Sequence, residues 1–184
     1  MVYVYLAEGF EEIEALAPVD ILRRCGVEVR TVGVTGKTVA GAHGICVEAD
    51  ILPEAVSLED AQMLVLPGGI PGTPNLEKDA RVTEAVKNAH AQGKYIAAIC
   101  AAPSVFGHLG LLKGKTATCY PGFEAELYGA QPVEDGVVCD GNIITAKGAG
   151  RASDFGFLLA GLLVGGEKAL EIRKAMQYAE AEEN

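Results

Sequence analysis

Short runs of aliphatic residues alternate along the chain with longer stretches whose apolar residues recur every three or four positions. The runs predict buried strands, and the periodic stretches predict amphipathic helices. We expect strands over residues 2–6, 27–34, 45–47, 63–66, 96–99 and 115–119, and short strands over 137–139 and 143–145. We expect helices over residues 11–25, 75–92, 103–111, 123–128, 152–164 and 167–179, followed by a frayed acidic tail over residues 180–184.

Cap and turn residues support these boundaries. Gly26 stands where a C-cap glycine closes the first helix, and Asn75 is placed to cap the helix that ends near Gln92. Asp140-Gly141-Asn142 predicts a hairpin turn between the two short strands, and residues 36–41 form a glycine-containing, turn-rich segment.

The alternation of strands and helices predicts one α/β domain over residues 1–184, with helices on both faces of a mostly parallel sheet. In such sheets, ligands bind beyond the carboxyl ends of the strands. Three predicted strand ends carry conspicuous residues: Ala7-Glu8-Gly9 with Glu14 beyond it, Pro67-Gly68-Gly69, and Cys100-Ala101-Ala102.

Composition narrows the classes of partner. The net charge of −10 and a pI near 4.8 disfavour nucleic acid as a partner. Residues 155–164, the longest apolar stretch near the end, are too few to span a bilayer, and the first strand lacks the basic flank of a signal peptide. We therefore expect a cytoplasmic protein without a membrane partner.

The five cysteines are odd in number, widely spaced and free of CxxC pairs. This pattern disfavours a disulfide framework or a zinc site and favours a reducing compartment. The sequence suggests no histidine–carboxylate cluster, so we expect neither a metal nor another cofactor.

Cys100 is the strongest candidate for chemistry. It follows an apolar strand and precedes a helix, and the small residues around it suit a sharp turn. A thiol at a helix N-terminus is expected to ionise more readily, and the N–H of Ala101 is placed to bind an oxyanion. The unobstructed N–H groups of Gly68 and Gly69 provide a second set of donors. The alternative is that Cys100 is a small buried hydrophobe. For the other four cysteines, near a helix end or in strand-like runs, we expect structural roles.

These residues belong to a longer series of motifs. The series is Gly9-Phe10-Glu11-Glu12-Ile13-Glu14 with Pro18-Val19-Asp20, Leu66-Pro67-Gly68-Gly69, Ala97-Ala98-Ile99-Cys100-Ala101-Ala102-Pro103, and Gly148-Ala149-Gly150 before a helix containing Phe155. In this order, over nearly the whole chain, the series closely resembles the DJ-1/ThiJ/PfpI superfamily, within it the DJ-1-like branch that includes the YajL-type bacterial proteins.

The resemblance implies a flavodoxin-like three-layer sandwich, a homodimer, and Cys100 as the reactive, oxidation-prone cysteine. Glu14 matches the acidic residue that family members place against that cysteine, where a protonated carboxyl donates a hydrogen bond to sulfur and shuttles protons. Without the resemblance, the sequence favours a solvated helix residue at Glu14 over a functional one; its apolar neighbours give only weak support for burial, while Glu11 and Glu12 supply exposed charges.

The chain also departs from the family pattern. DJ-1 carries a histidine where this chain has Tyr120, and a phenol is a poor general base near neutral pH. PfpI-type peptidases carry a histidine directly after the nucleophile, where this chain has Ala101, so a protease is disfavoured. His43 matches a segment that lines the active-site mouth near the dimer interface in relatives; it is a substrate-binding candidate or a surface loop residue.

Two functions follow from the resemblance. The first is a stress-protective enzyme, a glutathione-independent glyoxalase or deglycase that acts on methylglyoxal, related 2-oxoaldehydes or their adducts through Cys100. The second is a non-catalytic redox sensor or chaperone that operates by oxidation of Cys100. A thiamin-pathway role, suggested by the ThiJ name, is disfavoured because the chain has no GxxxxGK[ST] phosphate loop.

Overall fold

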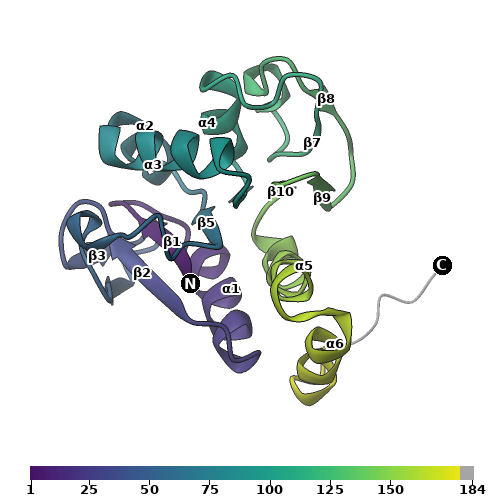
Figure 1. Ribbon diagram of the computed structural model, residues 1–184. Helices are drawn as coiled ribbons and strands as arrows, with labels where there is room; N and C mark the ends of the chain where they lie inside the picture. Colours follow the sequence, from purple (N-terminus) through teal and green to yellow (C-terminus); the bar gives the residue numbers. More distant parts are fainter. Residues whose placement is uncertain (179–184) are drawn as a thin grey trace.

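A six-stranded sheet lies at the centre of the molecule, with strand order β2-β1-β5-β6-β10-β9. The strands pair in parallel except at one edge, where β9 runs antiparallel to β10. The computed structural model describes residues 1–178 (Figure 1). The predicted tail over residues 180–184, and the end of the last predicted helix at residue 179, lie outside the described residues.

The elements have the following bounds. The strands are β1 (Val2–Leu6), β2 (Val29–Gly33), β3 (Thr38–Ala40), β4 (Cys46–Glu48), β5 (Met63–Leu66), β6 (Tyr95–Ile99), β7 (Thr116–Ala117), β8 (Gln131–Pro132), β9 (Val137–Asp140) and β10 (Ile143–Ala146). The helices are α1 (Glu12–Arg24), α2 (Gly72–Lys78), α3 (Ala80–Ala91), α4 (Pro103–His108), α5 (Ala152–Val164) and α6 (Gly166–Ala175), with 3₁₀ turns η1 (Pro53–Ala55), η2 (Glu124–Glu126) and η3 (Ala149–Arg151).

Helices cover both faces of the sheet, which confirms the predicted three-layer α/β sandwich. Figure 1 shows α1, α5 and α6 on one side of the strands and α2, α3 and α4 on the other. Successive residues of β1 serve opposite cores: Val4 packs in the core of α1 and α5, and Tyr5 packs in the core of α3 and α4. The alternation explains why the predicted strands read as continuous apolar runs, since both faces of the sheet are buried.

The parallel register brings the predicted strand ends to one edge of the sheet. Val2 of β1 pairs with Met63 of β5, and Met63 pairs with Tyr95 of β6. These three strands therefore end side by side, and the loops that follow Leu66 and Ile99 adjoin the loop before α1. The fold thus assembles one site from three loops that are far apart in the sequence.

Several predicted boundaries were wrong. The expected helix over residues 75–92 is two helices, because Asp79 caps α3 by accepting from the Arg81 N–H. Asn75 lies inside α2, and its side-chain amide donates to the Glu8 carbonyl instead of capping a helix. The turn-rich segment over 36–41 contains β3, which forms a small antiparallel sheet with β4.

The segment after α4 is less regular than its apolar residues suggested. Only Thr116 and Ala117 of the predicted strand over residues 115–119 are extended, and they pair with β8 outside the central sheet. The predicted helix over 123–128 is the single 3₁₀ turn η2. The strands at 137–140 and 143–146 form the predicted hairpin and join the main sheet as its edge.

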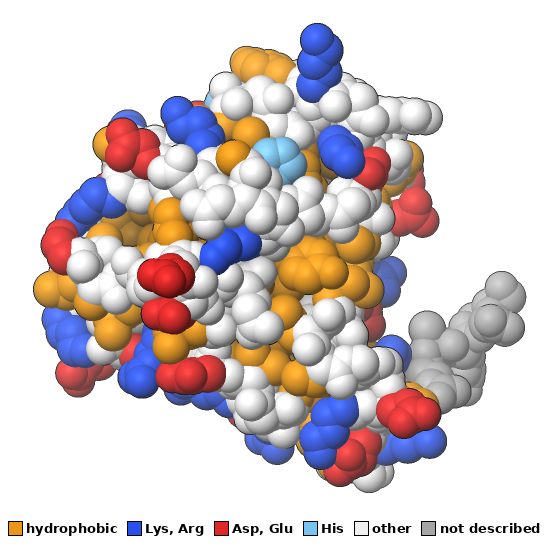
Figure 2. Space-filling view, in the orientation of Figure 1, with side chains coloured by type: hydrophobic (Ala, Val, Ile, Leu, Met, Phe, Trp, Pro, Cys, Tyr) orange, Lys and Arg blue, Asp and Glu red, His pale blue; other side chains and the backbone are white. Residues whose placement is uncertain are grey.

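The outer face is mixed in charge. Figure 2 shows acidic and basic side chains around the rim of one face, with apolar side chains gathered over the region of α5. Within the described residues, every helix is too short or too polar to cross a membrane.

The contact between α1 and α5 gives a sharp stability prediction. A Cβ at Gly156 would lie 2.9 Å from Ile21 Cδ1 and 3.1 Å from Pro18 Cα, whereas a Cβ at Gly161 in the same helix meets nothing within 4 Å. Gly156→Ala should lower the free energy of unfolding by about 1–3 kcal/mol through overpacking. Gly161→Ala should raise it by roughly 0.5–1 kcal/mol through helix propensity. Urea denaturation of both variants measures the difference, and equal effects would contradict the close α1–α5 contact.

Candidate active site

Cys100 occupies a strained backbone position at the end of β6. Its φ is +65°, a left-handed conformation that residues other than glycine rarely adopt. Hydrogen bonds hold the peptide on both sides, because the Cys100 N–H donates to the Ala146 carbonyl (2.9 Å) and the Tyr120 N–H donates to the Cys100 carbonyl (2.8 Å). Such strain persists only where surrounding structure enforces it, and it is concentrated at functional sites.

Glu14 reaches this cysteine from the first turn of α1. Its residue is only 1% exposed, and its side chain is hydrogen-bonded to the Cys100 sulfur. The N–H groups of Gly68 and Ala149 donate to the same carboxyl group, the Gly68 contact being 3.0 Å to Oε2. The backbone of Glu14 is fixed in turn by Glu11, whose carboxylate caps α1 by accepting from the Glu14 N–H at 2.7 Å.

Gly68 permits the contact between these two residues. A Cβ at this position would lie 2.6 Å from Cys100 Cβ and 2.6 Å from Glu14 Oε2. Any side chain at residue 68 would therefore push the acid and the thiol apart. Gly69 is constrained independently, because its φ is +94° and a Cβ would lie 2.4 Å from the Gly9 carbonyl oxygen.

The predicted N–H donors are divided between the two reacting groups. The N–H groups of Gly69 and Ala101 donate to the Cys100 sulfur, whereas the N–H of Gly68 donates to Glu14. The two walls of donors expected from the sequence therefore adjoin Cys100, but Gly68 is used to hold the acid.

Burial dominates the proton equilibria of the pair. It raises the pKa of Glu14 to about 7, against the opposing effect of hydrogen bonds from Cys100 and the two backbone N–H groups. It also raises the pKa of the Cys100 thiol to about 12, and the charge of an ionised Glu14 adds to this increase. The pair therefore releases one proton near neutral pH, mainly from Glu14, and retains the second mainly on the Cys100 sulfur, from which the neighbouring carboxylate is able to accept it.

This result corrects the expectation that the helix after Cys100 makes the thiol unusually acidic. Helix α4 has only six residues, and the donors that favour the thiolate are the individual N–H groups of Ala101 and Gly69. Their effect is smaller than that of burial, so a thiolate forms here when Glu14 holds the shared proton.

Tyr120 and the η3 loop form the outer wall of the site. Tyr120 is half-exposed, and its ring lies 3.3 Å from the Cβ position of Gly148, which is itself 3.9 Å from Glu14 Oε1. Tyr120, Gly148 and Ala149 line an open hollow beside the pair. The Ala149 N–H is a contact that sequence reasoning missed, although the Gly148-Ala149-Gly150 motif marked its position.

His43 lies elsewhere. Its backbone N–H donates to Glu12 Oε1 at 2.7 Å, and its Nδ1 lies 2.8 Å from Glu12 Oε2. Glu12 is buried, which corrects the expectation that it supplies an exposed charge. His43, Glu11 and Glu12 line a second hollow together with Ile13 and Ile45. The structure therefore does not bring His43 into the hollow beside Cys100.

This grouping is also a histidine–carboxylate cluster that the sequence did not indicate. One ligand atom from each of Glu11, Glu12 and His43 lies within 4.8 Å of the others, the one such metal-compatible group found in residues 1–178. The Glu12 oxygens already accept from the N–H groups of His43 and Ile45 and contact the His43 ring. These bonds account for the cluster without a metal.

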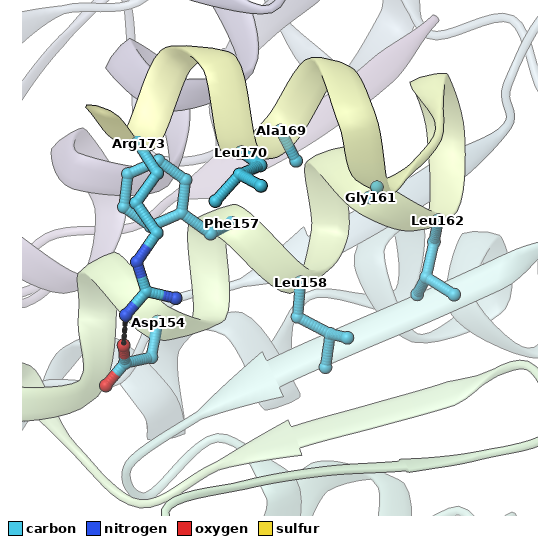
Figure 3. Close-up of a pocket in the computed structure, with 9 residues that line it drawn as sticks. Asp154, Phe157, Leu158, Gly161, Leu162, Ala169, Leu170 and Arg173 are labelled. Atoms are coloured by element: carbon cyan, nitrogen blue, oxygen red, sulfur yellow. Dashed lines mark ion pairs between the residues drawn. The ribbon is translucent and has the colours of Figure 1, made fainter. Parts of the chain in front are cut away.

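A further hollow lies between α5 and α6. Figure 3 shows Phe157, Ala169 and Leu170 between the two helices, with the Asp154–Arg173 ion pair at one end. Its described lining contains neither a cysteine nor a histidine. The chemistry of the molecule is therefore better sought at Cys100 than in this apolar hollow.

The shared proton predicts a two-step pH profile for Cys100. Alkylation by iodoacetamide, followed by mass spectrometry of the Cys100 peptide, should rise near pH 7 and again far above it. Glu14→Gln should remove the lower step and leave a single step below the upper one of the unmodified protein, because the neighbouring negative charge is gone. Glu11→Gln, which removes a charge that raises the Glu14 pKa, should move the lower step to lower pH without removing it. A Glu14→Gln profile that keeps the step near pH 7 would contradict this assignment.

Comparisons with known proteins agree with this architecture. The model of the DJ-1/PfpI family matches residues 1–161. The chain is 35% identical over 179 residues to protein dj-1beta of Drosophila melanogaster, covering 96% of each chain. It is 39% identical over 174 residues to DJ-1 homolog B of Arabidopsis thaliana, covering 93% of this chain but only 40% of that longer protein.

Solved structures and a more distant relative extend the comparison. The structure described as oxidized Toxoplasma gondii DJ-1 superposes with a TM-score of 0.93 at 38% identity, covering 97% of this chain and 98% of the other. A Pyrococcus abyssi protein named a deglycase is 30% identical over 148 residues, covering 79% of this chain and 89% of its own length. The fold, the order of the motifs and these similarities together show that the chain belongs to the DJ-1/PfpI family.

Proposed function

We propose that this chain is a cysteine-dependent, stress-protective enzyme that converts 2-oxoaldehydes such as methylglyoxal, or their early adducts with amines, without glutathione. The observation that carries the proposal is the hydrogen-bonded pair of Glu14 and Cys100, with backbone donors beside the sulfur. The deglycase name of the Pyrococcus abyssi relative supports the same class of chemistry.

The reaction begins with addition to the aldehyde. In the reactive form, Glu14 holds the shared proton and Cys100 is a thiolate. The sulfur attacks the aldehyde carbon, a C–S bond forms, and the carbonyl π electrons move to oxygen to give a hemithioacetal. The N–H groups of Gly69 and Ala101, which donate to the sulfur, are close enough to the new C–O⁻ group to stabilise it.

The second stage is an internal redox exchange. After giving its proton to the hemithioacetal oxygen, Glu14 removes the hydrogen of the former aldehyde carbon as a proton and returns it to the neighbouring carbon through an enediol. The aldehyde carbon is oxidised to a thioester and the ketone carbon is reduced to an alcohol. Water then attacks the thioester, the C–S bond breaks, and lactate and the thiol are released. The sum is methylglyoxal plus water giving lactic acid, with no external oxidant.

The elevated pKa of Glu14 suits this role. A carboxyl with a pKa of about 7 is able to donate and accept a proton at neutral pH, whereas an ordinary exposed glutamate is almost fully ionised there. Tyr120 contributes a phenol at the outer wall, where it is able to donate a hydrogen bond to bound substrate.

The alternative function is redox sensing by the same sulfur. The Cys100 thiolate would attack one peroxide oxygen: an S–O bond forms, the O–O bond breaks, and the departing hydroxide takes the Glu14 proton and leaves as water, giving a sulfenic acid. A second peroxide would oxidise the sulfenic acid to a sulfinate in the same way, with release of another water. The donors Gly69, Ala101 and a protonated Glu14 suit the oxygens of such a product. The oxidised state named for the Toxoplasma gondii relative favours this possibility.

We also propose that the chain forms a homodimer through α1 and the segment before β4. Ile13 and Ile45 are large aliphatic residues that are 57% and 56% exposed, and they line the same hollow. Burying this surface against a second copy would remove it from water. The free cysteines suit a reducing compartment, so we assign the protein to the cytoplasm.

The enzymatic proposal predicts glutathione-independent production of lactate from methylglyoxal by the purified protein. Cys100→Ala should abolish turnover, and Glu14→Gln should lower kcat by about two to four orders of magnitude through loss of acid–base catalysis. Cys139→Ala, which removes an exposed cysteine on β9, is the matched control and should retain activity. Lactate and pyruvate should be measured separately by enzymatic assay.

The same protein distinguishes the alternative. If peroxide converts Cys100 to a sulfinate while no lactate forms from methylglyoxal or from glycated amines, the sensor function holds and the enzymatic proposal fails. If Cys139→Ala loses as much activity as Cys100→Ala, the assignment of the nucleophile is wrong.

The dimer proposal predicts that a charge at its centre separates the copies. Ile45→Glu should shift the sedimentation coefficient from a dimer to a monomer, because a buried unpaired carboxylate is costly. Leu170→Glu on α6, a residue of comparable exposure outside the proposed interface, should leave the dimer intact. Unmodified protein that sediments as a monomer at micromolar concentration would overturn the proposal.

A further inference from the structure

We propose that Arg151 and Lys147 form an anion subsite at the mouth of the Cys100 site, which selects aldehydes or adducts carrying a carboxylate or phosphate group. The substrate class rests on the proposed function, whereas the subsite itself is testable by a reaction that needs no turnover. Three features of the structure support the proposal: the position of the hollow, the placement of the two cations, and the charge of the reacting pair.

The hollow is lined by residues that contact the reacting pair. It has a volume of about 530 Å³ and is lined by Tyr120, Pro121 and residues 147–151. The Tyr120 N–H donates to the Cys100 carbonyl, and the Ala149 N–H donates to Glu14. A molecule attached to the sulfur by its aldehyde carbon therefore has this hollow beside it, and its remaining atoms extend along the lining residues.

Both charged residues of the lining are cations, and the backbone brings them together at Gly136. The Lys147 N–H donates to the Gly136 carbonyl at 2.9 Å. The Arg151 side chain lies over the same glycine, where a Cβ would be 2.8 Å from Arg151 Nε. Lys147 also directly follows Ala146, whose carbonyl accepts from the Cys100 N–H. The backbone therefore connects both cations to Cys100: Lys147 follows a residue hydrogen-bonded to Cys100, and Arg151 contacts the glycine that is hydrogen-bonded to Lys147.

The present partners of these two cations differ in how firmly they are held. Lys147 pairs with Glu134, whose side chain is 88% exposed, at 2.5 Å, and Arg151 pairs with Asp154 at 3.3 Å. Exposed ion pairs contribute little to stability, so an anionic ligand is able to replace Glu134 at small cost. Asp154 is held separately by the Tyr178 hydroxyl at 3.0 Å, so it keeps a partner when Arg151 turns to a ligand. Neither carboxylate is part of the lining.

The reacting pair itself explains why cations are needed here. Glu14 and Cys100 carry one negative charge after their first deprotonation, and Glu11 adds a carboxylate next to Glu14. In a chain of net charge −10, an anionic substrate approaches against repulsion. Two cations at the mouth offset this repulsion for a substrate whose anionic group lies a few bonds from its aldehyde.

Two alkylating agents of nearly equal size test the subsite. Iodoacetate is an anion and iodoacetamide is neutral; with each, the thiolate attacks the CH2 carbon, a C–S bond forms, and iodide leaves. The quantity measured is the iodoacetate-to-iodoacetamide rate ratio for the Cys100 peptide at pH 8 and low salt, relative to the same ratio for the exposed Cys46 and Cys139 in the same chain. This ratio cancels differences in the reactivity of the Cys100 sulfur.

We expect Arg151→Gln and Lys147→Gln each to lower the Cys100 ratio by about two- to fivefold, and the double variant to lower it further. Salt at 0.5 M should lower the ratio of the unmodified protein toward that of the variants. Gly136→Ala, which keeps both charges but crowds Arg151, should lower the ratio as well. Arg151→Lys keeps a positive charge and should retain most of the ratio of the unmodified protein. The matched control is Arg30→Gln, which removes an exposed arginine on β2 and should leave the ratio unchanged.

A Cys100 ratio that is unchanged in the Arg151→Gln Lys147→Gln double variant, and insensitive to salt, would overturn the subsite. That result is compatible with turnover of neutral methylglyoxal, so it leaves the proposed function intact. Conversely, a protein that makes no lactate but shows the expected ratios retains the anion subsite and loses the enzymatic proposal. Circular dichroism confirms that each variant is folded before its ratio is interpreted.

Discussion

The hydrogen bond between the Glu14 carboxyl and the Cys100 sulfur is the interaction on which the rest of the site depends. It joins the first turn of α1 to the end of β6, two elements separated by most of the first half of the chain. The contact exists because Gly68 has no side chain, and because Cys100 accepts a left-handed backbone that aims its sulfur at the acid. The parallel register supplies the remaining condition, since it brings three strand ends to one edge of the sheet. A change in any of these would separate the pair while leaving most of the core intact.

A buried acid and a buried thiol that share one proton behave as a single titrating unit. Burial penalises each ionised form, and the first charge to appear raises the cost of the second. The unit therefore holds one negative charge over a wide range above neutral pH, located on oxygen or on sulfur. This property serves addition to an aldehyde and reaction with a peroxide equally well, because both need a thiolate with a proton donor beside it. The local geometry consequently favours a class of sulfur chemistry more strongly than it favours one substrate.

The sequence predicted the elements whose apolar pattern is continuous and failed where a distant contact decides the structure. The strands β1 and β5 and the helix α5 have the expected bounds, since buried runs and long periodic stretches carry their own signal. Asp79 interrupts a stretch with continuous helical periodicity, and its capping role competes with that pattern. The burial of Glu12 could not be predicted, because its partners His43 and Ile45 are about thirty residues away and belong to a loop. For the site, the turn around Cys100 was visible in local residue types, whereas the contact with Glu14 came from the resemblance to a family.

Net charge sums over the whole molecule, whereas the electrostatic potential at the mouth of the site depends most on the nearest charged groups. At ordinary ionic strength the many carboxylates of this chain are screened beyond about 8–10 Å, so their sum does not reach the sulfur with full effect. Glu14 contacts the sulfur and Glu11 acts on Glu14, whereas the cations Arg151 and Lys147 line the adjoining hollow and meet at Gly136. An acidic protein is therefore able to present a locally balanced entrance to a buried anionic nucleophile. The same balance limits how basic the mouth becomes, because an excess of positive charge would pull the shared proton away from Glu14 and weaken the acid that the sulfur needs.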